Sequence, residues 1–420
     1  MEPEVAETLP LITNDAVVLG LLMCILGFVF WGSSRTEGFW ARFYAVVPSI
    51  LMCYFLPSLL ATFHVIDGDL SNLYFVSSRY LLPASLVLLT LSIDFKGILG
   101  LGPKALIMFF TGTLGIVLGG PVALLFASAV VPSAVGADVE SVWRGMTTVA
   151  GSWIGGGANQ TAMKEIFEVD DEVFSAMVAV DVIVANVWMA VLLFCAGRSE
   201  AIDQRTGADA SAITELRERV EHYTAQIRRI PSLADTMVVL AAGFGATALA
   251  HFLADRIAPW IAEAAPGLAR YSLTSTFFWI VVVATTAGLV LSFTKARELE
   301  GVGASRIGSV LLYVLVASIG MKMNLGAILE RPGLFLIGAI WMSIHAGLLI
   351  LVAWAIKAPV FFMAVGSQAN VGGAASAPIV ASAFHPALAS VGVLLAVLGY
   401  AVGTYAAWFC GILMQAAAVG

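Results

Sequence analysis

Ten runs of mostly apolar residues dominate the sequence. Each is close to the length of about 20 residues that an α-helix needs to cross the hydrocarbon core of a bilayer. Inside that core every backbone N–H and C=O must be paired within the protein, so only helices and closed barrels can span it. The runs cover residues 15–32, 42–63, 74–93, 104–131, 171–196, 233–255, 271–293, 306–325, 333–356 and 386–416. The sequence therefore predicts an all-α polytopic membrane protein.

Composition supports this class and excludes others. Of the 420 residues, 60% are hydrophobic and 12% are charged, whereas roughly 25% of the residues in a soluble domain are charged. The formal net charge of −7 leaves no basic patch for nucleic acid. Residues 1–15 are acidic and contain no Lys or Arg, which is the wrong sign for a signal peptide. We therefore treat residues 15–32 as a span of the mature chain.

The sequence shows no constellation for enzymatic chemistry. The four cysteines lie inside apolar runs, and the five histidines show no zinc-binding spacing, so we expect neither disulfides nor a metal centre. No nucleophile–base pair appears, and the glycine-rich stretch lacks the lysine of a nucleotide-binding loop. We expect no enzyme activity and no cofactor other than a coupling ion, Na⁺ or H⁺.

Two glycine-rich stretches interrupt the apolar pattern. Residues 150–162 read AGSWIGGGANQTA, and residues 365–376 read VGSQANVGGAAS. Consecutive glycines leave the backbone unshielded, so such segments must be buried in protein or line a cavity. They lie within the broken segments 141–165 and 358–381, one in each half of the chain. A pair of interrupted segments at corresponding positions is the best sequence indication of a transporter's binding site.

The order of the spans repeats along the chain. Each half has four spans, a broken segment and one further span, so we assign residues 1–197 and 233–420 to two repeats and residues 198–232 to a linker. Residues 92–96 (SIDFK) also resemble residues 318–322 (SIGMK), each at the end of a third span. An internal duplication of this kind is typical of secondary transporters.

The relative direction of the repeats depends on how the broken segments run. If both cross the membrane, the repeats are parallel; if both turn back, each repeat has five crossings and the second is inverted. With an external N-terminus and re-entrant segments, 14 of the 21 Lys and Arg residues lie in cytoplasmic loops, against 12 of 21 for the alternative. Positive residues favour the cytoplasmic side. The charges therefore favour inverted repeats, an external N-terminus and a cytoplasmic linker.

The linker carries one amphipathic pattern. Its apolar residues recur every three or four positions between charged ones. They are Ile213, Leu216, Val220, Tyr223, Ile227 and Ile230. This spacing predicts a helix with one apolar stripe, lying against the membrane or the protein. A dimer contact or a regulatory arm is the alternative.

Broken helices offer chemistry that unbroken spans lack. The N-terminal end of a half-helix attracts an anionic group such as a carboxylate, and the carbonyl end of the other half can ligate sodium. Neutral amides and hydroxyls beside the glycines suit both roles. The candidate substrate- and ion-binding residues are Ser152, Gly156, Gly157, Asn159, Gln160, Thr161, Asp181, Ser367, Gln368, Asn370, Gly372, Gly373 and Ser376. The candidate sodium ligands are Asn159, Thr161, Asn370 and Asp181. The alternative is that these small residues only allow helices to pack closely.

Two ionisable residues lie well inside predicted spans. Asp181 is the one carboxylate in such a position, and a charge there costs roughly 2.5–3.5 kcal/mol on insertion scales, so it indicates an ion or proton site. In the structural alternative, Asp181 pairs with a lysine or caps a broken segment. His345 either relays protons or, as is more usual, bonds a neighbouring backbone carbonyl.

Three longer motifs resemble those of a known family. They are GSWIGGGAN at residues 151–159, GSQANVGGAASAP at residues 366–378 and GVLLAVLGY at residues 392–400. These motifs resemble the YjcL-like domain-of-unknown-function 819 family, which has no settled activity. That family is grouped with the cation/proton antiporter and anion transporter superfamily, which includes bile-acid:sodium and glutamate:sodium symporters. The resemblance implies inverted repeats, crossed discontinuous helices and a moving core domain beside a panel domain that often forms a homodimer.

The sequence and the resemblance together predict a secondary active transporter. The leading hypothesis is sodium- or proton-coupled symport of a small organic anion by elevator-like alternating access. A cation/proton antiporter is the first alternative, although such proteins usually rely on acids at the helix crossing, and residues 152–161 and 366–376 contain none. A non-transporting membrane sensor or assembly protein is the second, but it leaves the paired Asn-Gly breaks unexplained.

Overall fold

The protein is built from helices that are long and apolar enough to cross a membrane. The computed structural model describes residues 10–44, 47–136, 138–208, 230–323, 331–385 and 388–419. In this part of the chain all regular secondary structure is helical, and seven helices meet the length and hydropathy of a span. They are α1 (Asp15–Ser33), the continuous helix formed by α4 (Leu73–Val76), η1 (Ser77–Leu81) and α5 (Leu82–Leu91), α7 (Pro103–Val130), α10 (Asp171–Ala196), α13 (Leu233–Ala264), α17 (Gly333–Ala355) and α20 (Ala389–Val419). The prediction of a polytopic all-α membrane protein is confirmed.

Three of the ten predicted spans take a different form. Two correspond to bent pairs of helices, α2 (Gly38–Tyr44) with α3 (Ser49–Thr62) and α14 (Thr276–Ser292) with η3 (Lys295–Val302). The third corresponds to α15 (Ala304–Gly320), an apolar helix of 17 residues. The shorter connecting helices are α6 (Phe95–Gly100), α8 (Pro132–Val135), α11 (Ser199–Thr206) and η2 (Pro266–Tyr271). The predicted amphipathic helix of the linker falls almost wholly within 209–229, outside the described residues.

The first glycine-rich stretch folds a helix back on itself. Within α9 (Val139–Ile166), Gly156 has φ 73° and ψ −175°, a conformation that is open essentially to glycine. The arms before and after Gly156 lie side by side. Arg144, near the start of α9, donates to the Phe167 carbonyl just beyond its end at 2.7 Å, and the rings of Trp143 and Phe167 are 5.9 Å apart. We call this element the first hairpin.

The second glycine-rich stretch forms a matching hairpin. Helices α18 (Val360–Val371) and α19 (Gly373–Phe384) are joined at Gly372, and Gly373 has φ 57°. The rings of Phe361 and Phe384, at the two far ends of this pair, lie 5.3 Å apart. We call α18 and α19 the second hairpin. Because the two ends of each hairpin lie together, neither broken segment runs from one end of the molecule to the other. This agrees with the re-entrant segments that the distribution of charges favoured.

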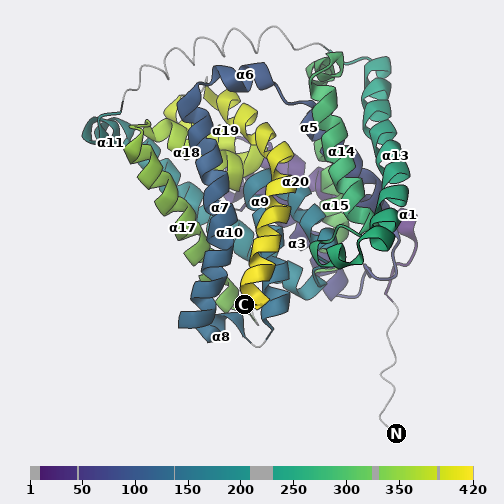
Figure 1. The fold of residues 1–420 in the computed structure, drawn as a ribbon. Coiled ribbons are helices and arrows are strands. Elements are labelled where there is room, and N and C mark those ends of the chain that lie inside the picture. Colours follow the sequence, from purple (N-terminus) through teal and green to yellow (C-terminus); the bar gives the residue numbers. More distant parts are fainter. Residues whose placement is uncertain are drawn as a thin grey trace.

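The hairpins open toward opposite ends of the molecule (Figure 1). The first begins just after α8, at the lower end of the view. The second begins beside α11, at the upper end, where Asp203 accepts a hydrogen bond from the Val360 amide at 2.9 Å. Their tips meet inside the protein, since a Cβ built on Gly373 would lie 3.9 Å from the Cα of Gly156. Opposed hairpins agree with inverted repeats, and the duplication itself stays a prediction.

The helices pack in two groups. The hairpin bundle comprises α7, α9, α10, α17, α18, α19 and α20, and the flanking bundle comprises α1, α3, α4, α5, α13, α14 and α15. Each half of the chain contributes first to the flanking bundle and then to the hairpin bundle. Contacts are dense within each bundle and sparse between them. The assignment of these bundles as panel and core domains stays a prediction.

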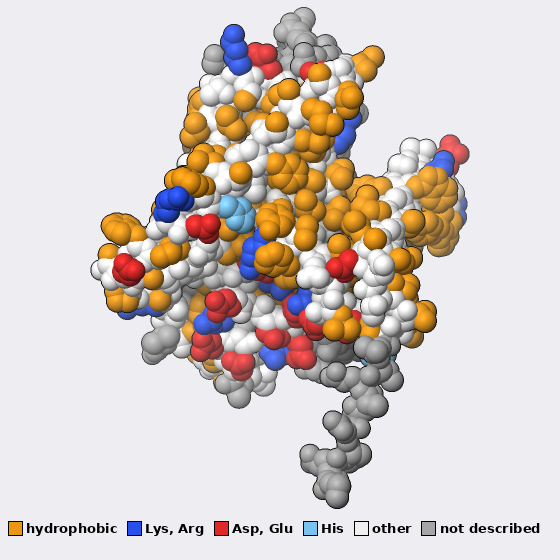
Figure 2. All heavy atoms as spheres, turned by 90° about the vertical axis from the view of Figure 1, so that its right-hand side faces the viewer, with side chains coloured by type: hydrophobic (Ala, Val, Ile, Leu, Met, Phe, Trp, Pro, Cys, Tyr) orange, Lys and Arg blue, Asp and Glu red, His pale blue; other side chains and the backbone are white. Residues whose placement is uncertain are grey.

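The outer face of the flanking bundle is apolar. Figure 2 shows apolar side chains over much of this face, and charged side chains gathered toward its lower part. The exposed side chains on α13 include Leu233, Met237, Val238, Phe244, Leu249, Phe252 and Trp260. An apolar surface of this extent is expected where helices face lipid.

Candidate functional site

The candidate site lies where the two hairpin tips meet. The second arm of the first hairpin begins at Gly157, and α19 begins at Gly373. Each tip thus presents the N-terminal end of a half-helix, whose first N–H groups have no partner within the helix and which attracts negative charge. Gly157 faces Ile50 of α3, with a built Cβ 3.5 Å from its Cδ1. The tips therefore lie at the junction of the two bundles.

Asn159 fastens the first hairpin to α20. Its Nδ2 donates to the carbonyls of Gly155 at 2.9 Å and Tyr400 at 3.2 Å. Its Oδ1 accepts a hydrogen bond from the Thr404 hydroxyl at 2.6 Å. Glycine permits this approach of the helices, because a Cβ at Gly403 would lie only 2.6 Å from Asn159 Nδ2. The amide of Asn159 thus joins one arm of the hairpin to a neighbouring helix.

Asn370 fastens the second hairpin to α7 in the same way. Its Nδ2 donates to the carbonyls of Phe109 at 2.9 Å and Gly366 at 3.0 Å. Its Oδ1 accepts a hydrogen bond from the Thr113 hydroxyl at 2.7 Å. Each asparagine therefore bonds the carbonyl four residues earlier in the chain, a carbonyl of a neighbouring helix, and a threonine four residues further along that neighbour. For Asn159 the first of these bonds crosses the break at Gly156, whereas for Asn370 it lies within α18. We call the two arrangements the asparagine clamps.

The clamps give Asn159 and Asn370 a packing role. Both side chains are fully buried, and both hydrogens of each amide group are bonded within the protein. A buried polar group satisfied in this way rigidifies the contact it makes. Direct contact of either residue with a substrate or sodium ion stays a prediction.

Asp181 joins the two arms of the first hairpin. Its Oδ1 accepts from the Trp153 indole at 2.7 Å, and its Oδ2 accepts from the Gln160 amide at 2.9 Å. Trp153 precedes Gly156 and Gln160 follows it, so the carboxylate bridges the break. In the described residues no Lys or Arg forms an ion pair with Asp181. Of the two structural alternatives, the bonds of Asp181 to both arms of the first hairpin fit the capping of a broken segment, and they do not fit a pairing with lysine.

Ser367 belongs to a separate polar chain around His345. The imidazole Nδ1 lies 3.0 Å from the Gly112 carbonyl, and Nε2 lies 2.8 Å from Ser367 Oγ. A carbonyl only accepts, so Nδ1 carries a proton; in a neutral imidazole, Nε2 would then accept from the serine hydroxyl. Ser367 Oγ in turn accepts from the Trp188 indole at 2.7 Å. His345 thus bonds a backbone carbonyl of a neighbouring helix, the more usual of the two roles.

Gln368 carries an acceptor without a partner. Its Nε2 donates to Ser376 Oγ in the first turn of α19 at 2.6 Å, while its Oε1 is buried with no hydrogen bond. Thr161, in the first hairpin, donates to the Gly157 carbonyl at 3.0 Å. Gln368 and Ser376 thus bond each other beside the second tip, and Thr161 bonds a glycine of the first tip.

The predicted site residues separate into local groups. Six lie at or beside the tips: Gly156, Gly157, Gly372, Gly373, Gln368 and Ser376. Gln160 and Asp181 form a second group, and Ser152 is buried in the other arm of the first hairpin, next to Trp153 in the sequence. The four candidate sodium ligands bond to different partners, and no contact in the described residues brings them together. A shared sodium site of these four stays a prediction.

Sequence reasoning missed the partners of these residues. Thr113 and Thr404 complete the clamps, and Trp153 and Trp188 donate to Asp181 and Ser367. A polar residue in mid-span, as Thr113 and Thr404 are, was the available signal, because membrane helices use such hydroxyls to bond across to their neighbours.

Comparison with known proteins places the chain in a family. The family described as "Protein of unknown function (DUF819)" matches residues 20–417. The "Uncharacterized membrane protein YjcL" of Bacillus subtilis (strain 168) is 25% identical over 362 residues, which cover 81% of this chain and 83% of the relative. The family match spans nearly the whole chain and agrees with the resemblance of its motifs. The protein therefore belongs to the DUF819 family of membrane proteins.

Proposed function

We propose that the protein is a secondary active transporter that carries a small organic anion together with Na⁺ or H⁺. One observation carries this proposal: two helical hairpins enter the hairpin bundle from opposite ends and meet at glycine tips inside it. Paired interrupted helices of this kind form the substrate sites of many secondary transporters, because irregular backbone is tolerated within a membrane only where it is buried or lines a cavity.

The tips favour an anionic substrate. The half-helices that begin at Gly157 and Gly373 direct their N-terminal ends to the same region. The partial positive charge at a helix N-terminus, together with its unpaired N–H groups, stabilises a carboxylate or phosphate. The stretches 152–161 and 366–376 contain no acidic residue, and Asp181, which reaches the first of them from α10, is bonded to Trp153 and Gln160.

The division into two bundles supports alternating access. Because contacts between the bundles are sparse, the hairpin bundle can move as a body against the flanking bundle. Such a movement would carry the tips from one side of the membrane to the other, as in an elevator. The proposed setting is a bacterial inner membrane, with the N-terminus outside, the linker 198–232 in the cytoplasm and a homodimer as the assembly.

A cation/proton antiporter is the second candidate, and Asp181 is the observation that favours it. This carboxylate is buried on the first hairpin and bonded to neutral donors in the described residues. A buried carboxylate without a counter-charge is costly when ionised, so it is suited to binding a proton or a cation. In the symport proposal, Asp181 is the candidate residue that binds the coupling ion.

A thermal-shift screen and vesicle uptake test the proposal together. Small organic anions, with and without sodium, should raise the melting temperature of the purified protein, because a ligand that binds the folded state stabilises it. Gly157→Ala should reduce this shift, since its Cβ makes only an ordinary 3.5 Å contact with Ile50 but fills space at the tip. Gly347→Ala is the matched control, because a Cβ there meets nothing within 4 Å.

The outcomes separate the candidates. Anion-dependent stabilisation and uptake that Gly157→Ala weakens and Gly347→Ala leaves intact would support anion symport. Sodium-driven proton efflux without any organic solute would favour the antiporter. If no anion shifts the melting temperature and vesicles show neither flux, the proposed function is wrong.

A further inference from the structure

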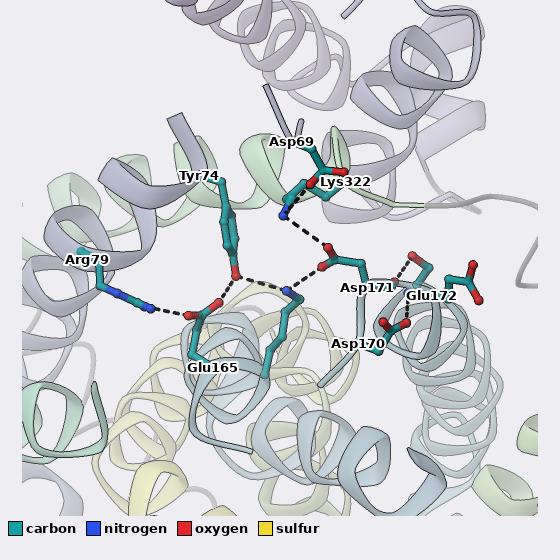
Figure 3. Close-up of polar contacts among 10 residues, drawn as sticks. Asp69, Tyr74, Arg79, Glu165, Asp170, Asp171, Glu172 and Lys322 are labelled. Carbon is teal, nitrogen blue, oxygen red and sulfur yellow. Dashed lines mark hydrogen bonds and ion pairs between the residues drawn. The ribbon is translucent and has the colours of Figure 1, made fainter. Parts of the chain in front are cut away.

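A cluster of charged side chains connects the two bundles at the open end of the first hairpin (Figure 3). We call it the junction cluster. It consists of Asp69, Tyr74, Arg79 and Lys322 from the flanking bundle and its loops, and Lys164, Glu165 and Asp171 from the hairpin bundle. Three cations face three carboxylates around one tyrosine. The cluster is therefore close to neutral as a whole, although each member carries a charge or a hydroxyl.

Four contacts in the cluster cross from one bundle to the other. Arg79 Nη1 lies 2.7 Å from Glu165 Oε2, and Lys322 Nζ lies 3.4 Å from Asp171 Oδ2. The Tyr74 hydroxyl donates to Glu165 and accepts from Lys164 Nζ at 3.2 Å. Figure 3 shows Tyr74 placed between Arg79 and Lys322, with the carboxylates of Glu165 and Asp171 directed toward them.

Two further ion pairs hold the cluster together, one within each bundle. Lys164 pairs with Asp171 at 2.7 Å inside the hairpin bundle, and Lys322 pairs with Asp69 at 2.9 Å on the flanking side. The side chains of Lys164 and Glu165 are only 7% and 12% exposed. Their partners, Asp171 and Arg79, are 35% and 30% exposed, so each ion pair is partly buried. Removing Arg79 or Asp171 would leave the more buried charge of its pair without a partner.

The opposite end of the molecule is joined differently. There, Arg297 pairs with Asp94 at 2.9 Å, and both lie on the flanking side. Lys104 Nζ donates to the Lys357 carbonyl at 2.8 Å within the hairpin bundle. In the described residues, ion pairs that cross between the bundles occur only in the junction cluster. The two ends of the bundle interface are therefore unequal.

We propose that the junction cluster is a gate that closes the end of the molecule where the first hairpin opens. It holds the end of α9 and the start of α10 against η1 and the segment after α15. This inference rests on the proposed function, because only a moving hairpin bundle needs such contacts to break. When that bundle moves to expose the tips at this end, Glu165 and Asp171 must separate from Arg79 and Lys322. The structure is then the state in which the gate is closed.

Hydrogen–deuterium exchange on the purified full-length chain in lipid nanodiscs tests the gate without any substrate. Glu165→Gln keeps the shape of the side chain and removes its charge, so exchange in residues 157–166 should become roughly tenfold faster or more. Arg79→Gln should act alike, and the double variant should increase exchange by less than the two single effects combined, because both changes remove the Arg79–Glu165 ion pair. Tyr74→Phe removes only the bridging hydroxyl and should give a smaller increase.

The control is Glu140→Gln. Glu140 pairs with Arg144 at 2.8 Å near the same end of α9, but both belong to the hairpin bundle, so its exchange should match the wild type. Unchanged exchange in Glu165→Gln, Arg79→Gln and Tyr74→Phe would overturn the gate, as would an equal increase in Glu140→Gln. If exchange is faster in these variants but the wild-type protein transports no solute, the contact between the bundles is supported and the transport proposal is refuted.

Discussion

Replacing Asn370 by Asp should destabilise the protein more than replacing it by Ala. This order is unusual, because Asp is nearly isosteric with Asn. It follows from the clamp: in the variant, a carboxylate oxygen replaces Nδ2 and faces the carbonyls of Phe109 and Gly366, which lie 2.9 and 3.0 Å from that position. Neither carbonyl can donate a hydrogen bond. The variant therefore buries a negative charge against two acceptors.

The magnitudes follow from the groups left behind. In Asn370→Ala, the Thr113 hydroxyl can still bond the Phe109 carbonyl, from which it lies 3.3 Å, and the cost should be about 2–3 kcal/mol in the free energy of unfolding. In Asn370→Asp, an uncompensated buried charge raises the cost to about 3–5 kcal/mol. Thr113→Val removes one hydroxyl and should cost about 1 kcal/mol.

Thermal unfolding in detergent measures this order, with sodium chloride compared against choline chloride. We expect melting temperatures to fall from the wild type through Asn370→Ala to Asn370→Asp, independently of sodium. If Asn370 instead ligated sodium, an aspartate would offer an oxygen with added charge, and sodium would stabilise the variant. An Asp variant as stable as the wild type, or rescued by sodium, would refute the clamp. The same test applies to Asn159, whose partners have the same geometry.

Three further outcomes can be measured as melting temperatures. Asp203→Ala removes the carboxylate that accepts a hydrogen bond from the Val360 amide at the start of α18, and it should lower the free energy of unfolding by about 1 kcal/mol. Asp203→Asn keeps an acceptor and should retain most of the stability. Equal losses in the two variants would contradict a capping role for Asp203. Gly156→Ala should cost roughly 1–3 kcal/mol, because φ 73° with ψ −175° is strained for any other residue, and an unchanged melting temperature would argue against the hairpin turn. Burial alone would lower the pKa of Lys322, but its bonds to two carboxylates raise it overall above its ordinary value. A raised lysine pKa contributes stability that is fully present below the unfolded pKa and is lost as pH rises through the folded one. The destabilisation of Lys322→Gln relative to the wild type should therefore persist at alkaline pH and disappear only above about pH 10.4; a difference that vanishes below about pH 9 would contradict the ion pairs.

The spans and the positions of the two breaks were predictable because their signals are local. The length of an apolar run predicts directly whether it can span the membrane, and the three consecutive glycines at 155–157 predict a break in the helix at that position. The distribution of Lys and Arg then favoured segments that turn back, and the contacts across each hairpin agree with that topology. The ends of the bent and short helices were predicted less accurately, because a turn such as the one between α14 and η3 changes the hydropathy of the sequence little.

The contacts of the site were not predictable, because they join residues far apart in the chain. Thr113 lies 257 positions from its partner Asn370, and no local periodicity relates them. Ser367 was grouped with the tips because it stands beside Gln368 in the sequence, yet successive residues on a helix point about 100° apart. Its side chain accordingly faces His345 and Trp188 rather than the tip.

The clamp on the first hairpin has a consequence for biosynthesis. Asn159 is made in the first half of the chain, but Thr404, which bonds it from α20, follows 245 residues later. Until that last helix enters the membrane, the newly made hairpin holds an amide whose bonds to α20 have not formed, in surroundings where such a group is costly. Assembly of the first half therefore cannot finish before the second has been translated. A chain that stops short of α20 should expose a polar defect that membrane quality control can recognise.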